Sequence, residues 1–346
     1  MKTMLLTGIR QMEMRNTPDP LIASDTDVLI RMMTVGVCGS DIHYYTSGRI
    51  GSQIVKYPFP VGHECAGIVE QTGNGVTKVK PGDRVAIEPA MSCGVCDQCL
   101  AGRPHTCRKL RFLGCPGQAD GCLSEFIVMP EQSCFPIPGN MDFEMATISE
   151  PLSIGLYSVR QSVELEGKSI GILGHGPIGM SVLFSAIIAG AANIYVTDKI
   201  EERLALARKT GAYWTGNPDA GDVVMQIREQ KPLLLDVIYE CCGQQEAMDQ
   251  AVALVKPGGK IMIIGIPEFD FWKLQSDIIR RKEICFQNVR RQNHCVQPAL
   301  DLINSGKVDV KSMVTHRFPF NRTREAFDLV AEYRDGVMKA MINIGG

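Results

Sequence analysis

Residues 169–179 read SIGILGHGPIG, and this stretch decides the fold class. Its first five residues are apolar or small, which is typical of a buried strand, and a glycine-rich turn, G-x-G-x-x-G, follows directly. In such a turn Gly174 permits the tight bend, Gly176 lets a pyrophosphate approach the backbone, and Gly179 allows the next helix to pack closely. An apolar segment at 177–189 continues from the turn and predicts that helix. Because free N–H groups at a helix start favour phosphate, the stretch predicts a dinucleotide site.

An acidic residue after the next strand supports the same interpretation. Residues 193–197 predict a strand, and Asp198 ends it, about 20 residues after the turn. A carboxylate there accepts hydrogen bonds from both ribose hydroxyls and repels a 2′-phosphate, so we predict NAD rather than NADP. Lys199 follows immediately and weakens that preference. The residues predicted to bind the dinucleotide are Gly174, Gly176, Pro177, Ile178, Gly179 and Asp198.

Downstream of this motif, predicted strands keep alternating with predicted helices. The strands are at 235–240, 260–265 and 284–289, and the helices are at 201–209, 245–255 and 276–281. This alternation favours a parallel, doubly wound sheet.

The first 150 residues differ in character, because they are rich in Gly and Pro and contain short alternating strands. Predicted strands at 27–32, 67–70 and 84–87 are bounded by turn signals, which favours a β-barrel or sandwich-like unit. The fold class is therefore α/β plus β.

A length of 346 residues exceeds one ordinary compact domain, so two domains are expected. The final segment returns to mixed character, with predicted helices at 296–304 and 323–333 and a late strand at 340–344. We expect this segment to rejoin the first domain. The predicted domains are 1–152 together with 289–346, and 153–288.

The charge balance excludes several classes of partner. The chain has 36 basic and 38 acidic residues, a net charge of −2, which argues against binding to nucleic acid. It carries no polybasic patch for a membrane surface, and its longest apolar run, 182–192, is too short to span a bilayer. We expect neither nucleic-acid nor membrane binding.

Thirteen cysteines are an odd number, so they cannot all pair within the chain. The apolar stretch at residues 1–10 is too short for a secretory signal core. We therefore expect a cytoplasmic protein whose thiols are reduced and available for metal. Most of the isolated thiols are expected to be buried and unreactive, namely Cys65, Cys115, Cys122, Cys134, Cys285 and Cys295.

Four cysteines form a compact cluster, with gaps of two, two and seven residues: Cys93, Cys96, Cys99 and Cys107. Short gaps let successive thiolates converge on one tetrahedral Zn²⁺. The loop has little apolar content, so a metal would supply the order that it lacks. His105 is a competing ligand, but four thiolates already fill the coordination sphere. Because a closed site leaves no open position, this zinc is predicted to be structural.

A second metal site is suggested by Cys38, which precedes Asp41 and His43, and by His63 with Glu64. Cys, His and carboxylate ligands hold zinc with one coordination position left open. Taken alone these residues are weak evidence, since Asp41 could cap a helix start and His43 could lie on the surface.

Together these features resemble the zinc-dependent medium-chain alcohol dehydrogenases, and within them the polyol (sorbitol/xylitol) dehydrogenase branch. The family motifs stand at 36–43, 62–64 and 81–85 and in the four-cysteine lobe, and the branch motifs at 43–45, 48–51, 87–89, 150–153 and 316–319. The resemblance covers nearly the whole chain. It implies a GroES-like catalytic domain, a Rossmann coenzyme domain, a cleft between them, and a homotetramer or homodimer.

The resemblance also implies residue roles. It places a catalytic zinc on Cys38 and His63, with Glu64 as third ligand, and leaves open whether Glu64 or Glu150 contacts the metal. With the lobe, this gives two Zn²⁺ per chain. The other implied positions are Ser40 and His43 in a proton relay, Tyr44, Glu150 and Arg290 at the substrate, and Arg203, Gly265, Val289 and Arg290 at the cofactor. Ser40 could instead cap a helix, Tyr44 could line the cleft, and Arg203 could be a solvated charge.

The implied reaction is oxidation of a secondary hydroxyl of a polyol (sorbitol-, xylitol- or iditol-like) to a ketose, with hydride transfer to NAD. Arg291 departs from the sorbitol dehydrogenase pattern, which has tyrosine there. An additional cation favours an anionic or otherwise different substrate, although a solvated or interface arginine is equally consistent. The alternative is therefore a zinc dehydrogenase of the same fold acting on a sugar acid, a sugar phosphate or an amino alcohol such as threonine. A zinc-free quinone reductase would lack Cys38 and the lobe, and a non-catalytic zinc- and nucleotide-binding protein is the remaining class.

Overall fold

The computed structural model describes residues 1–345, which form two compact units. One unit consists of Met1–Glu150 and the segment from Val296 onward, and the other is Pro151–Cys295. The boundary after Glu150 falls inside helix α3 (Phe143–Arg160). Sequence analysis did not predict this helix, because Pro151 in its interior is typical of a helix break.

The second boundary also differs from the expected one, since residues 289–295 group with the second unit. The backbone N–H of Val289 donates to the carbonyl of Ile263 at 2.9 Å, and Arg160 Nη1 lies 3.3 Å from Cys295 Sγ. These contacts attach the segment to Ile263 and to the end of helix α3, which both belong to the second unit.

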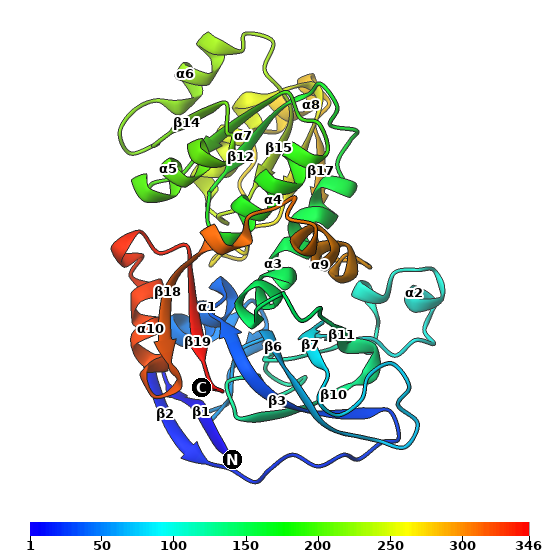
Figure 1. Cartoon of the computed structure of the whole chain (residues 1–346). Helices are drawn as coiled ribbons and strands as arrows, with labels where there is room; N and C mark the ends of the chain where they lie inside the picture. The colour runs from blue at the N-terminus through cyan, green and yellow to red at the C-terminus, as the bar shows by residue number, and fades with distance from the viewer. Residues whose placement is uncertain (346) are drawn as a thin grey trace. The chain divides into compact units, whose positions relative to one another are not determined.

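Seven strands form the main sheet of the first unit: β3 (Asp27–Gly36), β6 (Glu64–Thr72), β7 (Arg84–Ile87), β10 (Phe126–Pro130), β11 (Cys134–Pro136), β18 (Val314–Pro319) and β19 (Lys339–Asn343). Their order is β11-β7-β6-β3-β19-β18. Strand β10 pairs with the first half of β3, on the edge opposite β6. Figure 1 shows β19, from the end of the chain, beside β3, from its beginning, with β18 next to β19. The first unit is thus closed by strands that are far apart in sequence.

Strand β3 shows why this sequence forms a sheet. Val28, Ile30 and Met32 are buried, and the residues between them are half-buried, which is the two-residue alternation of a strand with one face on a core. The buried side chains join one apolar cluster of the first unit that also includes Val69 and Val85 from the neighbouring strands.

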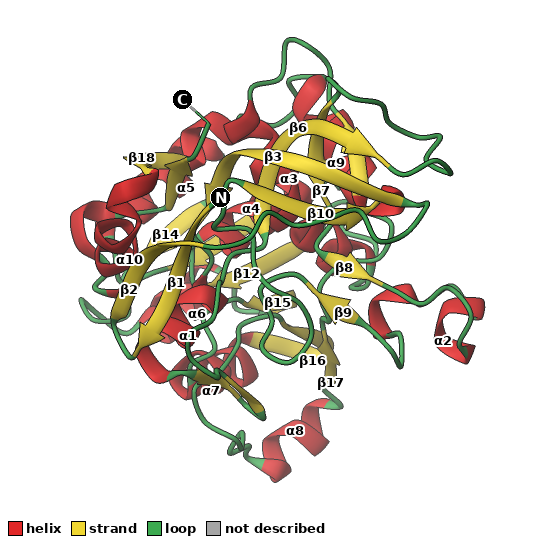
Figure 2. Ribbon diagram, turned by 90° about the horizontal axis from the view of Figure 1, so that it is seen from below, coloured by secondary structure: helices red, strands yellow, loops and turns green. Residues whose placement is uncertain are grey.

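Smaller elements complete the first unit (Figure 2). They are the paired strands β1 (Lys2–Gly8) and β2 (Gln11–Asn16), β4 (Arg49–Ile50) and β5 (Gln53–Ile54), β8 (Ala90–Met91) and β9 (Arg111–Phe112), and the helices α1 (Gly39–Ser47), α2 (Asp97–Leu100), α9 (Val296–Asn304) and α10 (Thr323–Ala331).

Six parallel strands form the sheet of the second unit: β12 (Ser169–Leu173), β13 (Asn193–Thr197), β14 (Trp214–Gly216), β15 (Leu235–Glu240), β16 (Val255–Ile263) and β17 (Cys285–Asn288). Their order is β14-β13-β12-β15-β16-β17, which is the 3-2-1-4-5-6 order of a doubly wound dinucleotide-binding sheet. The helices of this unit are α4 (Pro177–Ile188), α5 (Glu201–Thr210), α6 (Val223–Gln230), α7 (Gln245–Leu254) and α8 (Ser276–Lys282). The predicted parallel, doubly wound sheet is confirmed.

The turn between β12 and α4 requires glycine at two positions. Gly174 has a φ of 91°, in the left-handed region. A Cβ on Gly179 would lie 2.1 Å from the carbonyl oxygen of Gly174, so any side chain would push the helix away from the strand.

Within residues 1–345, no helix is both long and apolar enough to cross a membrane.

Candidate active site

Two neighbouring strands bring the predicted catalytic metal ligands together. Cys38 follows the end of β3, and His63 and Glu64 stand at the start of β6, where Gly36 pairs with Glu64. One ligand atom each from Cys38, His63 and Glu64 lies within 4.8 Å of the others. A thiolate, an imidazole and a carboxylate are the donors of a catalytic zinc site with an open position, so these residues fit that metal.

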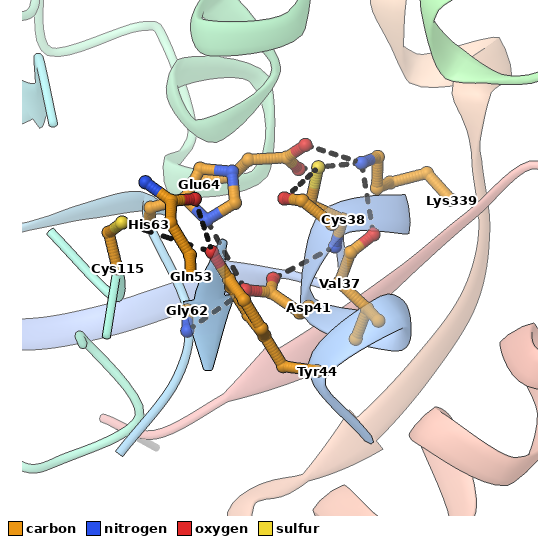
Figure 3. A network of polar contacts seen from close by, with 11 residues as sticks. Val37, Cys38, Asp41, Tyr44, Gln53, Gly62, His63, Glu64, Cys115 and Lys339 are labelled. Atoms are coloured by element: carbon orange, nitrogen blue, oxygen red, sulfur yellow. Dashed lines mark hydrogen bonds and ion pairs between the residues drawn. The ribbon is translucent and has the colours of Figure 1, made fainter. Parts of the chain in front are cut away.

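Asp41 fixes the orientation of His63. Its carboxylate is fully buried and lies 3.3 Å from His63 Nδ1, and it accepts the backbone N–H groups of Cys38 and Gly62, each at 3.2 Å. Burial lowers the pKa of His63, but the charges of Asp41 and Cys38 raise it well above its usual value. Because Nδ1 faces Asp41, Nε2 is the nitrogen available to a metal (Figure 3).

Glu64 forms a buried ion pair with Lys339, and both side chains are 1% exposed. Lys339 Nζ donates to Glu64 Oε2 at 2.6 Å and Oε1 at 2.8 Å, and to the carbonyl of Val37 at 3.0 Å (Figure 3). Burial lowers the pKa of Lys339, but the charges of Glu64, Cys38 and Glu150 and the hydrogen bond to Glu64 together raise it more, so the ammonium stays charged. A metal that takes Glu64 as a ligand must therefore share this carboxylate with Lys339.

Glu150, on α3, is a further buried carboxylate. Burial raises the pKa of Glu150, the charges of His63 and Lys339 lower it, and those of Glu64 and Glu88 raise it, so that it lies at about 8. The charges of His63 and Glu64 thus act on Glu150, whereas the donor atoms that lie within 4.8 Å of one another come from Cys38, His63 and Glu64. Glu150 as a metal ligand stays a prediction.

The predicted relay residues and Tyr44 lie on α1, which begins just after Cys38. Ser40 Oγ donates to Cys38 Sγ at 3.3 Å, and His43 stands three residues further on, on the same side of the helix. Tyr44 Oη donates to Gln53 Oε1 at 3.1 Å and lies 3.8 Å from Cys115 Sγ. Ser40 is thus in direct contact with a predicted metal ligand.

The four-cysteine lobe has the geometry of a tetrahedral thiolate site. Cys96 Sγ lies 3.6 Å from Cys99 Sγ and 3.8 Å from Cys107 Sγ. Zinc–sulfur bonds of about 2.3 Å place tetrahedral sulfurs about 3.8 Å apart, so the cluster fits zinc. The backbone N–H groups of Arg108 and Cys99 lower the pKa of Cys96 to about 6, which favours the thiolate.

The predicted dinucleotide residues converge in the second unit. Asp198 Oδ2 accepts the backbone N–H of His175 at 2.6 Å, and Oδ1 accepts that of Ile200 at 2.9 Å. A Cβ on Gly176 would lie 3.4 Å from Arg203 Nη1, so this cation borders the turn. The tight turn, the helix start and the carboxylate fit a dinucleotide.

The remaining predicted residues lie at the ends of two strands of that unit. Gly265 follows β16, and its backbone N–H donates to the carbonyl of Glu240 at 3.0 Å. Val289 follows β17 and is half-buried, whereas Arg290 is exposed.

Five of the six isolated cysteines are buried as expected, and Cys285 is the exception because it lies exposed on β17.

Comparison with known proteins identifies the family. Residues 24–139 match the model of the alcohol dehydrogenase GroES-like domain, and residues 177–305 match that of the zinc-binding dehydrogenases. The sorbitol dehydrogenase of Bacillus subtilis is 35% identical over 343 residues, which cover 99% of this chain and 97% of that protein. The chain belongs to the zinc-dependent medium-chain alcohol dehydrogenases.

Two further proteins are also similar to this alcohol dehydrogenase over most of its length. L-idonate 5-dehydrogenase of Vitis vinifera is 34% identical over 325 residues, covering 92% of this chain and 88% of that one. The structure of a zinc-binding dehydrogenase from Sinorhizobium meliloti, bound to NADP, is 29% identical with a TM-score of 0.90 over 99% of both chains. The predicted family, with its polyol branch, and the predicted GroES-like and Rossmann fold class are confirmed.

Two residues of the dehydrogenase site were not predicted as functional. Asp41 belongs to the suggested second metal constellation, but the only role predicted for it is a helix cap. It does accept the backbone N–H of Cys38, and its other oxygen lies 3.3 Å from His63 Nδ1. Lys339 immediately precedes the predicted strand 340–344, and a lysine beside an apolar strand was the one signal that could have marked it. Its partner Glu64 is 275 residues away along the chain.

Proposed function

We propose that this chain is an NAD-dependent zinc dehydrogenase that oxidises a secondary hydroxyl of a sorbitol-, xylitol- or iditol-like polyol to a ketose. The observation that carries the proposal is the convergence of Cys38, His63 and Glu64, with one donor atom each within 4.8 Å. A relative named sorbitol dehydrogenase, similar over nearly its whole length, supports the substrate class.

Two Zn²⁺ are proposed per chain. Cys38, His63 and either Glu64 or Glu150 would hold the catalytic ion, and Cys93, Cys96, Cys99 and Cys107 would hold the structural one. When bound, the catalytic zinc supplies a Lewis acid that lowers the pKa of a substrate hydroxyl, and NAD supplies the hydride acceptor. Asp41 keeps His63 in the orientation that such a site requires.

Ser40 and His43 are proposed to carry the proton away. Ser40 Oγ, beside Cys38, would receive the proton of the substrate hydroxyl, and the half-buried imidazole of His43 would take it onward. Tyr44, Glu150 and Arg290 are proposed to contact the substrate. The carbinol carbon then loses its hydride and becomes the carbonyl carbon of the ketose.

NAD is the proposed cofactor because Asp198 would repel a 2′-phosphate. Gly174, Gly176, Pro177, Ile178 and Gly179 would hold the pyrophosphate, with Arg203, Gly265, Val289 and Arg290 around the rest of the molecule. The Sinorhizobium meliloti structure with NADP shows that the fold also accepts the phosphorylated cofactor, so the two must be compared directly.

A second candidate is an acid or phosphate of a sugar as substrate. Arg291 supplies an additional cation where the sorbitol dehydrogenase pattern has tyrosine, and a relative is named L-idonate 5-dehydrogenase. We further propose a cytoplasmic homotetramer or homodimer, which light scattering coupled to gel filtration would test.

The decisive experiment is a panel of alditols, inositols, sugar acids, sugar phosphates and amino alcohols, with NAD and with NADP. Turnover is followed by the absorbance of reduced cofactor, before and after treatment with a zinc chelator. We expect an alditol to give the highest kcat/KM with NAD, and activity to fall with chelation and return with zinc. A sugar acid that exceeds every alditol would establish the second candidate, and activity unaffected by complete zinc removal would contradict both.

A further inference from the structure

Lys199 lies next to Asp198 at the end of β13, yet its ammonium group is engaged by two acids. Nζ lies 2.8 Å from Asp219 Oδ1 and 3.8 Å from Glu246 Oε2. Asp219 follows β14, and Glu246 lies in the first turn of α7. Three separate segments of the second unit therefore meet at one lysine.

The side chain of Asn217 holds this arrangement in place. Asn217 Nδ2 donates to the carbonyl of Lys199 at 3.1 Å, and Asn217 Oδ1 accepts the backbone N–H of Asp219 at 2.9 Å. Asn217 thus links the loop that carries Asp219 directly to Lys199. The hydrogen bond to Asp219 and the charges of Asp219 and Glu246 raise the pKa of Lys199, so the ammonium remains protonated beside them.

We propose that Asp219 and Glu246 determine cofactor specificity by occupying the ammonium group of Lys199, so that it is not available to a 2′-phosphate. The inference rests on the proposed preference for NAD and assigns part of it to residues outside the glycine-rich turn. A lysine directly after Asp198 would otherwise be the natural partner of a ribose phosphate.

The balance of charge supports this assignment. Asp198, Asp219 and Glu246 contribute three negative charges, and Lys199 compensates one of them. A 2′-phosphate at this end of the sheet would add like charge to an acidic group. The three side chains of the ion pairs are 56%, 59% and 61% exposed, so solvent screens them and the effect of each acid is moderate.

The test compares the binding of NADH and NADPH by nicotinamide fluorescence at low ionic strength, which needs no substrate. The variants are Asp219→Asn, Glu246→Gln, both together, and both together with Lys199→Met. Asp249→Asn is the matched control, since Asp249 lies on the same helix as Glu246 but pairs with Gln245. A thermal unfolding curve for each variant verifies that it is folded.

We expect the wild type to prefer NADH, and the double variant to bind NADPH about tenfold more tightly, with NADH affinity changed less than about twofold. Lys199→Met should abolish that gain, and Asp249→Asn should not produce it. An unchanged NADPH affinity in the double variant would overturn the inference alone, as would a gain that survives Lys199→Met. A wild type that prefers NADPH would overturn the proposed cofactor and the inference with it.

Discussion

Lys339 and Glu64 form a charged pair that is 1% exposed on both sides. Lys339→Met leaves the Glu64 carboxylate buried without its cation, so we expect the free energy of unfolding to fall by about 3–5 kcal/mol. Denaturant unfolding in the presence of a chelator measures this. Glu64→Gln in the same chain removes the unpaired charge and should recover most of the loss. A single variant as stable as the wild type would contradict the importance of the pair.

His175 makes stability depend on pH. It is fully buried, and within residues 1–345 neither ring nitrogen has a hydrogen-bond partner. Burial, and then Arg203, lower the pKa of His175 from 6.5 to about 3. Between pH 6.5 and about pH 3, His175 is protonated in the unfolded chain but neutral in the folded chain. The contribution of this residue to stability is therefore largest above pH 6.5 and falls by about 1.4 kcal/mol per pH unit toward pH 3.

We expect His175→Leu to flatten that slope, and to leave stability at neutral pH equal or higher because an unpaired polar group is removed. Free energies of unfolding measured at several pH values on either side of 5 give the slope directly, where 5 is roughly the middle of the window. His294→Asn, which changes an exposed histidine of the same unit, should keep the slope of the wild type. A slope that His175→Leu does not alter would refute this account.

The four-cysteine lobe is an element that we propose to be organised by a metal. Apart from α2, which is four residues long, and a short 3₁₀ turn at Pro104–Thr106, it contains little regular structure. Cys96→Ser should reduce bound zinc from about two per chain to about one and expose the loop at 93–107 to proteolysis. Cys285→Ser, at an isolated exposed thiol, is the control and should change neither. Metal analysis and mapped limited digestion provide the readouts, and an intact zinc content would contradict the assignment.

At the level of elements, local patterns predicted the nucleotide-binding unit well. The turn, the helix after it and five of the six strands of the parallel sheet are each signalled by residues that are neighbours in sequence, whereas strand β14 and helix α6 were not predicted. Helix α3 was missed because Pro151, a residue that usually ends a helix, lies inside it. The Lys339–Glu64 pair was missed for a different reason, since only the pairing of β19 with β3 brings its members together.

For the whole molecule, the proposed metal ligands and the dinucleotide residues belong to different units, and this separation makes a clear prediction. All the proposed metal ligands lie in Met1–Glu150, and the residues of the dinucleotide site lie in Pro151–Cys295. His63→Ala should therefore lower turnover by at least about a thousandfold while NADH still binds with nearly normal affinity. Fluorescence titration and steady-state kinetics measure the two effects separately. His316→Asn, a histidine on β18, should leave both unchanged, and a near-normal rate in His63→Ala would disprove the catalytic metal site.

The return of the chain to its first unit has a consequence for biosynthesis. Strand β3 is made about 300 residues before its neighbour β19 and the cation Lys339. During synthesis from the N-terminus, the nucleotide-binding unit is complete while the other still has an open sheet edge and an uncompensated Glu64. Completion of the proposed metal centre therefore has to wait until β19 and Lys339 have been made, and until then the nascent chain is exposed to aggregation at the unpaired edge of β3.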